Sequence, residues 1–217
     1  MSDALARITR WLAAHAPRIL ESSLNPGASA AELSRLAAAV GRPLPPDYQE
    51  LYRWHNGLNE EAENWGSLFY GMRFIPLAEV LDAYQYQAAQ TMTSALDKAD
   101  ATVRPAVLQN PHWLRLGSDG GHGWLCVDLD PAAAGTYGQV IYLYEIQEIA
   151  FQVASSVTEL LAGFAHDLEQ GQYTLDEGAQ EDGNEFLVPN EQIDPGNWES
   201  AERWKAISAL FPPPAAA

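Results

Sequence analysis

The sequence predicts an α+β protein: a central, mostly antiparallel sheet flanked by helices, with an acidic C-terminal extension that ends in a short helix. Two observations predict this class. Apolar residues recur at helical spacing in the first half of the chain, and short strand-like runs with short links follow from Trp113 to Tyr144, a pattern typical of an antiparallel meander. The 217 residues can bury a substantial core. We expect one domain over residues 1–172 and an acidic tail over residues 173–217.

Helix start and end signals accompany the apolar stripes. Ser29 and Glu32 form a capping box, because the serine oxygen can accept a first-turn N–H while the glutamate reaches back. Pro46 suits a helix start, where its missing N–H is not needed, and Asn56-Gly57 can end that helix in the left-handed conformation. We therefore expect helices that begin near Ser2, Ala30, Pro46, Pro76 and Val157, the fourth of them reaching Met92.

Short runs rich in β-branched and aromatic residues alternate with turns. Glycine-bearing loops at 117–123 and 135–138 separate three of these runs. Apolar side chains on both faces of the run 123–128 indicate that it is covered on both sides. We expect strands at 65–69, 73–75, 113–117, 123–128, 139–144 and 149–153, and a loop over 97–112.

The tail changes character after Gln172. Residues 174–185 are polar, acidic and glycine-containing, with little to bury, as in a solvated, disordered segment. A short amphipathic helix is expected near 197–210, with Trp198 and Trp204 on one stripe. We interpret the tail as folded back onto the domain by these two tryptophans; the alternative is a helix that docks on a partner.

The net charge of −17 is unevenly distributed. Residues 1–115 carry ten Lys and Arg against twelve Asp and Glu, whereas residues 116–202 carry no Lys or Arg and seventeen Asp and Glu. Because such a segment cannot neutralise itself by local ion pairs, we expect a negative field that repels nucleic acid and anionic membranes and attracts basic partners. The alternative is that the acidity only keeps the protein soluble.

Composition also indicates a compartment. The single cysteine, Cys126, cannot form an internal disulfide, which favours a reducing compartment such as the cytoplasm. No apolar run reaches the roughly 18 residues of a membrane span, and no basic segment followed by an apolar run indicates secretion. An alanine-rich chain with two lysines is typical of a GC-rich bacterial genome.

Six short motifs occur in a fixed order between residues 30 and 172. They are Leu44–Tyr48, Trp54–Gly57, Phe74–Val80, Leu116–Leu129, Gly138–Ile141 and Val153–Leu161. The ordered set resembles the SUKH superfamily, which contains bacterial immunity proteins and fungal cell-wall-assembly regulators. The resemblance implies an α+β fold and a protein-binding function, and many bacterial members neutralise polymorphic toxins by direct binding. It implies no catalytic residues, because the matching positions are mostly architectural.

The best case for an enzyme uses Asp119, His122 and Asp128, with His112 nearby. Two histidines and two carboxylates around a glycine loop could bind a metal. Their spacing is that of no zinc motif, however, and Asp-Gly-Gly is ordinary turn chemistry. Cys126 lies in the middle of a strand, where a buried structural cysteine is expected. We expect no catalytic residue, metal or cofactor; an unrecognised hydrolase or metal enzyme is the less favoured alternative.

The acidic clusters, with aromatic anchors, form the candidate partner-binding surface. The candidate residues are Glu60, Glu61, Glu63, Trp65, Tyr70, Asp176, Glu177, Glu181, Asp182 and Glu185. We expect a non-enzymatic immunity protein that binds and neutralises a basic toxin domain and contacts neither nucleic acid nor membrane. The alternatives are a regulatory or scaffold protein of the same fold without a toxin partner, and a solvated acidic segment with no binding role.

Overall fold

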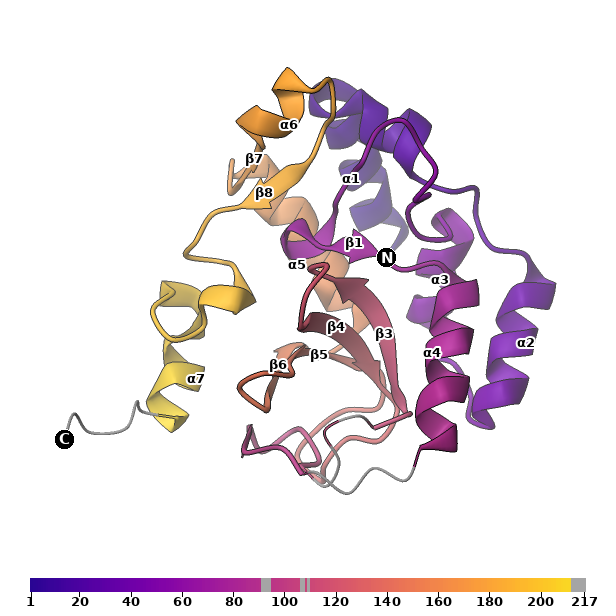
Figure 1. The fold of residues 1–217 in the computed structure, drawn as a ribbon, viewed down its shortest axis with the longest axis vertical. Helices are drawn as coiled ribbons and strands as arrows, with labels where there is room; N and C mark the ends of the chain where they lie inside the picture. Colours follow the sequence, from indigo (N-terminus) through magenta and orange to yellow (C-terminus); the bar gives the residue numbers. More distant parts are fainter. Residues whose placement is uncertain (91–94, 106–107, 109, 212–217) are drawn as a thin grey trace.

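The computed structural model describes residues 1–90, 95–105, 108 and 110–211, and a six-stranded sheet forms its centre (Figure 1). The strand order is β1-β3-β4-β5-β6-β2, and every pairing is antiparallel except that of β2 with β6. The bounds are β1 Arg73–Phe74, β2 Lys98–Ala99, β3 Trp113–Ser118, β4 Gly123–Asp128, β5 Gln139–Tyr144 and β6 Ile149–Ala154. The predicted α+β class and the antiparallel meander β3 to β6 are confirmed.

Helices α1 to α5 lie on one side of this sheet, with α5 between the sheet and α1, and α2 beside α4 (Figure 1). The bounds of all the helices are α1 Ser2–His15, α2 Ala30–Val40, α3 Pro46–Trp54, α4 Leu77–Ala89, α5 Val157–Glu169, α6 Glu177–Glu181 and α7 Lys205–Leu210, with a π-helical turn at Ile19–Ser23. The capping box of Ser29 and Glu32 is confirmed in both directions. The predicted end of the fourth helix, Met92, lies outside the described residues. Within the described part, no helix combines the length and hydrophobicity needed to cross a bilayer.

Both faces of the sheet are covered by apolar side chains. Leu125 and Val127 of β4 point into the main core beneath the helices. Cys126 points to the other face, in a smaller cluster with Trp113 and Leu96. The two-sided burial of β4 and the buried position of Cys126 are therefore confirmed. The expected loop 97–112 is only partly correct, because Lys98–Ala99 adds the edge strand β2 in parallel to β6.

The Asn56-Gly57 pair does not end a helix in the way we expected. Helix α3 stops at Trp54, and the next residue is extended. Asn56 instead joins two other helices, since its Oδ1 accepts from the Leu77 N–H at 2.9 Å and its Nδ2 donates to Glu32 Oε1 at 3.3 Å. Gly57 has a φ of +75°, and a Cβ there would lie 2.4 Å from the Pro76 nitrogen. The pair serves tertiary packing rather than helix termination.

The predicted strand at 65–69 is wrong. This segment has no strand pairing in the structure and ends in a 3₁₀ turn at Phe69–Gly71. Its polar groups bond to the tail instead of a strand: the Ser67 hydroxyl donates to Leu187 O and accepts from Leu187 N–H, both at 2.8 Å. A contact with a segment 120 residues away leaves no signal in local periodicity.

The tail packs onto the rest of the molecule. Strands β7 (Tyr173–Leu175) and β8 (Leu187–Pro189) form an antiparallel pair that encloses α6, so residues 174–185 form regular structure where we expected disorder. Trp198 and Trp204 are 2% and 6% exposed and belong to the main core. Both tryptophans thus hold the tail on the domain, as predicted. The expected helix near 197–210 is interrupted: 3₁₀ turns at 195–197 and 202–204 precede the short α7.

Candidate protein-binding surface

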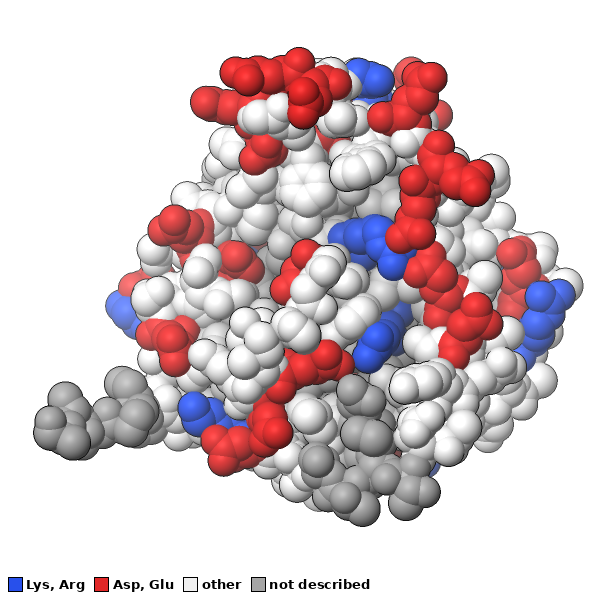
Figure 2. Space-filling model, viewed as in Figure 1, with Lys and Arg blue, Asp and Glu red and all other residues white. Residues whose placement is uncertain are grey.

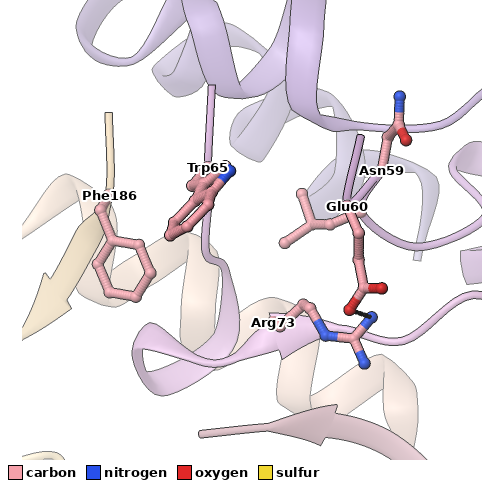
Figure 3. A pocket seen from close by; sticks show the side chains of 7 residues that line it. Asn59, Glu60, Trp65, Arg73 and Phe186 are labelled. Carbon is pink, nitrogen blue, oxygen red and sulfur yellow. Dashed lines mark ion pairs between the residues drawn. The ribbon is translucent and has the colours of Figure 1, made fainter. Parts of the chain in front are cut away.

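Trp65 has the most exposed large apolar side chain of the described residues, at 72%. It lies in the loop 59–66 that follows α3, which we call the Trp65 loop. Phe186, the residue before β8, lies on the same side of a hollow as Trp65, and Figure 3 shows the two rings next to each other with Glu60 and Arg73 across from them. Two aromatic side chains from distant parts of the sequence therefore line one hollow at the surface.

The Trp65 loop is held from beneath by buried polar side chains. Asn64 is fully buried, and its Nδ2 donates to Ser23 Oγ at 2.6 Å while its Oδ1 accepts from the Glu185 N–H at 2.7 Å. The Trp65 N–H in turn donates to Asn184 Oδ1 at 3.1 Å. Satisfied buried hydrogen bonds of this kind fix a unique backbone conformation. These hydrogen bonds thus join the Trp65 loop to the tail, and the Trp65 indole faces the solvent.

One hollow lies between the Trp65 loop and β1, with a volume of about 380 Å³. Leu58, Trp65 and Phe186 line it together with Glu60 and Arg73, and we call it the Arg73 hollow (Figure 3). Its volume is within the roughly 300–1,000 Å³ of ligand pockets. Most of its lining surface is apolar, although Asn59, Glu60 and Arg73 also line it, and such a surface suits an apolar group.

The guanidinium of the Arg73 hollow is already occupied by carboxylates. Arg73 donates to the two Glu79 oxygens at 3.0 and 2.7 Å and lies 3.0 Å from Glu60 Oε1, the pair dashed in Figure 3. The hydrogen bonds to Glu79 raise the pKa of Arg73 above its ordinary value. Two carboxylates around one cation leave no net positive charge to bind an anion.

A second hollow, of about 470 Å³, lies on the other side of Trp65. Glu63, Asp182 and Asn184 line it together with Trp65 and Phe186, and we call it the Asp182 hollow. No ion pair of the described residues involves Glu63 or Asp182. This hollow therefore combines aromatic faces with free negative charge, which suits a cation.

The other six predicted site residues fall into two groups, exposed residues and residues with internal contacts. Glu61, Glu177 and Glu181 are exposed. In contrast, Glu185 Oε2 accepts from the Arg18 N–H at 2.7 Å, and an Asp176 oxygen caps α6 by accepting from Ala179 N–H at 2.7 Å. Tyr70 is half-buried, packs its ring on Trp204, and has its pKa raised to about 12 by burial. The structure thus brings together Glu60, Glu63, Trp65 and Asp182, whereas Tyr70, Asp176 and Glu185 make internal contacts.

Sequence reasoning missed four residues of this surface. They are Asn64, Arg73, Asn184 and Phe186. Only Phe186 left a usable signal, because it opens the apolar run Phe-Leu-Val inside an otherwise polar tail. Asn64 and Asn184 act through tertiary hydrogen bonds, for which neither spacing nor composition is a guide.

The negative charge of residues 116–202 is partly neutralised by arginines outside that segment. Glu169 pairs with Arg7, Glu145 with Arg115, and Asp167 with Arg203. Figure 2 shows carboxylates that remain along the edge of one face, over α6 and the Trp65 loop, around an uncharged patch. Carboxylates therefore border the candidate surface, as they also do other parts of this face.

Three of the groups that could have supported catalysis, Asp119, Asp128 and Cys126, occupy structural positions, whereas the His122 side chain is exposed. Asp119 accepts the N–H groups of Gly121 and Gly123 at 2.7 and 3.0 Å, which is turn chemistry. Asp128 is fully buried and accepts from Gln139 Nε2 at 2.9 Å, and burial raises its pKa to about 6. Burial also raises the pKa of the Cys126 thiol to about 12. No described group of three or more His, Cys, Asp and Glu is arranged to hold a metal ion.

The fold is that of an α+β domain built on an antiparallel meander. The sequence profile of the SMI1 / KNR4 family (SUKH-1) matches residues 27–163, and the chain belongs to this family. The predicted SUKH resemblance is thereby confirmed, and the match covers α2 to α4, the first half of α5 and the whole six-stranded sheet.

Fungal regulators are among its relatives. The chain is 29% identical over 192 residues to the cell wall biosynthesis/cell cycle regulator smi1 of Schizosaccharomyces pombe, a match that covers 82% of this chain and 38% of the relative. It is 27% identical over 213 residues to the glucan synthesis regulatory protein of Neurospora crassa, covering 81% of this chain and 40% of the relative. The chain thus spans about two fifths of the length of these relatives.

These relatives overturn one prediction. The expected function, a bacterial immunity protein that neutralises a toxin, is wrong, because the matching proteins are fungal and two of them are named as regulators of cell wall biosynthesis and of glucan synthesis. The SUKH motifs could not separate the two branches, since the residues that carry them are architectural, as Asn56 and Gly57 illustrate. The alternative of a regulatory protein agrees better with the relatives.

Proposed function

We propose that this chain is a non-enzymatic regulatory or scaffold module that binds another protein through the surface around Trp65. The observation that carries the proposal is an indole, 72% exposed, on a loop fixed by buried hydrogen bonds. Tryptophan is enriched among the residues that dominate binding energy at protein interfaces. The two hollows beside it give a partner's side chains somewhere to be buried.

The process in which this module acts is inferred from its relatives. Two are named as regulators of cell-wall biosynthesis and of glucan synthesis. We assign this chain to the control of the same process, with a protein as its direct partner. The reduced, buried Cys126 supports a cytoplasmic location.

The surroundings of Asp119 and Cys126 support a non-enzymatic role. A general base needs a free, accessible lone pair near its substrate, whereas Asp119 is bound to backbone N–H groups of its own turn. A nucleophilic cysteine needs a lowered pKa, whereas that of Cys126 is raised to about 12.

Photo-cross-linking in cells tests the proposal. Replacing Trp65 with p-benzoylphenylalanine places a reactive aromatic ketone at the centre of the surface. The matched control is the same replacement at Ile146, which is 63% exposed in the turn between β5 and β6. We expect a discrete cross-linked protein from position 65 that is absent from position 146.

Two outcomes contradict the proposal. One is identical products, or none, from the two positions. The other is loss of the cell-wall function in Asp119→Ala cells with Trp65→Ala cells unaffected, because that would place the function at the glycine turn. The Asp119 variant must retain its thermal stability for this comparison, since its carboxylate holds the turn.

A further inference from the structure

Trp65 and Phe186 line both hollows, so the Arg73 hollow and the Asp182 hollow adjoin at this aromatic pair. We call the two adjoining hollows the Trp65 groove. Figure 3 shows the two aromatic side chains in the Arg73 hollow, with Arg73 and Glu60 across from them. The two hollows differ in chemistry, and this difference specifies the ligand.

The charges of the groove exclude an anionic ligand. Three carboxylates line it, from Glu60, Glu63 and Asp182, against the single guanidinium of Arg73. That guanidinium is held by Glu60 and Glu79. A phosphate or a nucleic acid would meet net repulsion, whereas a cation gains from Glu63, Asp182 and the exposed face of the indole.

We propose that the Trp65 groove binds an extended segment of a partner protein that places an apolar side chain in the Arg73 hollow and an Arg or Lys in the Asp182 hollow. This rests on the proposed function and adds the chemistry of the partner. Residues i and i+2 of an extended segment point to the same side. An apolar and a basic residue two positions apart therefore straddle the indole of Trp65.

The groove is built before the partner arrives. Asn64 and Asn184 fix the backbone on both sides of the aromatic pair through hydrogen bonds of 2.7 and 3.1 Å. Ser67 ties the next turn to Leu187 through two more. Binding to such a rigid surface does not have to order the loop, so more of the contact energy appears as affinity.

A peptide array probed with the purified full-length chain tests the inference. Each peptide is a flexible Gly-Ser decamer with two variable central residues, X and Z, separated by one alanine, and X and Z sample all amino acids. We expect selection of Leu, Ile, Met or Phe at X together with Arg or Lys at Z. Selection of Asp or Glu at Z, or no selection above background, overturns the inference.

Variants assign each preference to one end of the groove. Trp65→Ala lowers binding of the selected peptides about 30-fold or more, as expected of a central aromatic anchor. Glu63→Gln with Asp182→Asn lowers it about tenfold at low salt, less at high salt, and removes the preference at Z alone. Ile146→Ala, exposed elsewhere, changes nothing. A preference at Z that persists in the double variant contradicts the assignment.

The two proposals fail in distinguishable ways. If position 65 cross-links to a protein but the array shows no preference for Arg or Lys, the proposed binding function is supported. The proposed chemistry of the partner segment is then overturned. Absence of both the cross-link and the array signal overturns both.

Discussion

Trp204→Ala tests whether the tail belongs to the cooperative fold. The indole is 6% exposed, its ring centroid lies 5.4 Å from that of Phe151, and its Nε1 donates to Ile193 O at 3.1 Å. Truncating a buried tryptophan to alanine costs about 3–5 kcal/mol, because apolar contacts are lost and a cavity remains. For a chain of this size each kcal/mol lowers the Tm by about 2–4 °C, so we expect a fall of roughly 6–20 °C.

Differential scanning calorimetry measures this shift, with two variants as controls. Trp204→Phe retains an aromatic ring and loses the hydrogen bond, and we expect a loss of about 1 kcal/mol. Trp65→Ala removes an exposed indole, and we expect a change within about 0.5 kcal/mol. If Trp204→Ala unfolds within about 2 °C of the unaltered protein, the tail does not stabilise the core and the account of its packing is wrong.

Two further predictions concern a buried carboxylate and a strained glycine. Burial raises the pKa of Asp128 from 3.8 to about 6. The folded state therefore binds the carboxyl proton of Asp128 more tightly than the unfolded chain does. The stability that this group contributes is present below about pH 4 and is lost as the pH rises to 6. The pKa shift corresponds to at most about 3 kcal/mol. In urea titrations, the free energy of unfolding of Asp128→Asn relative to the unaltered protein should therefore rise by up to this amount from pH 4 to 7. A difference that does not change with pH would contradict this prediction. Gly57→Ala should destabilise by more than 2 kcal/mol, because φ is +75° and a Cβ would lie 2.4 Å from the Pro76 nitrogen. Gly41→Ala, at a φ of +67° with open space around it, should cost about 1 kcal/mol, and equal losses would refute the packing argument.

The sequence was a good guide to elements whose causes are local. The capping box of Ser29 and Glu32 and the meander β3 to β6 were predicted, because caps and alternation are properties of neighbouring residues. The strand predicted at residues 65–69 was wrong, because the hydrogen bonds of this segment go to the tail rather than to a neighbouring strand. Strand β2 was missed for a related reason: its two residues pair with β6, about 50 positions further along the chain.

The candidate surface was predictable only in part. Trp65 and the acidic residues around it could be proposed as binding groups, since aromatics and unpaired charge are typical of interfaces. Which of them share one surface depends on Asn64 and Asn184, which join the Trp65 loop to the tail. The same contact directs the half-buried Glu185 toward the backbone N–H groups of Arg18 and Ile19, from which it accepts hydrogen bonds. Tertiary hydrogen bonds thus decided the composition of the surface.

The central claim is that Trp65 anchors a protein partner. Isothermal titration of the partner identified by cross-linking, with the unaltered chain, Trp65→Ala and Ile146→Ala, tests it most directly. We predict an affinity about 30-fold or more weaker for Trp65→Ala and unchanged within about twofold for Ile146→Ala, because only the first side chain lies in the groove. Equal affinities for all three proteins would contradict the account.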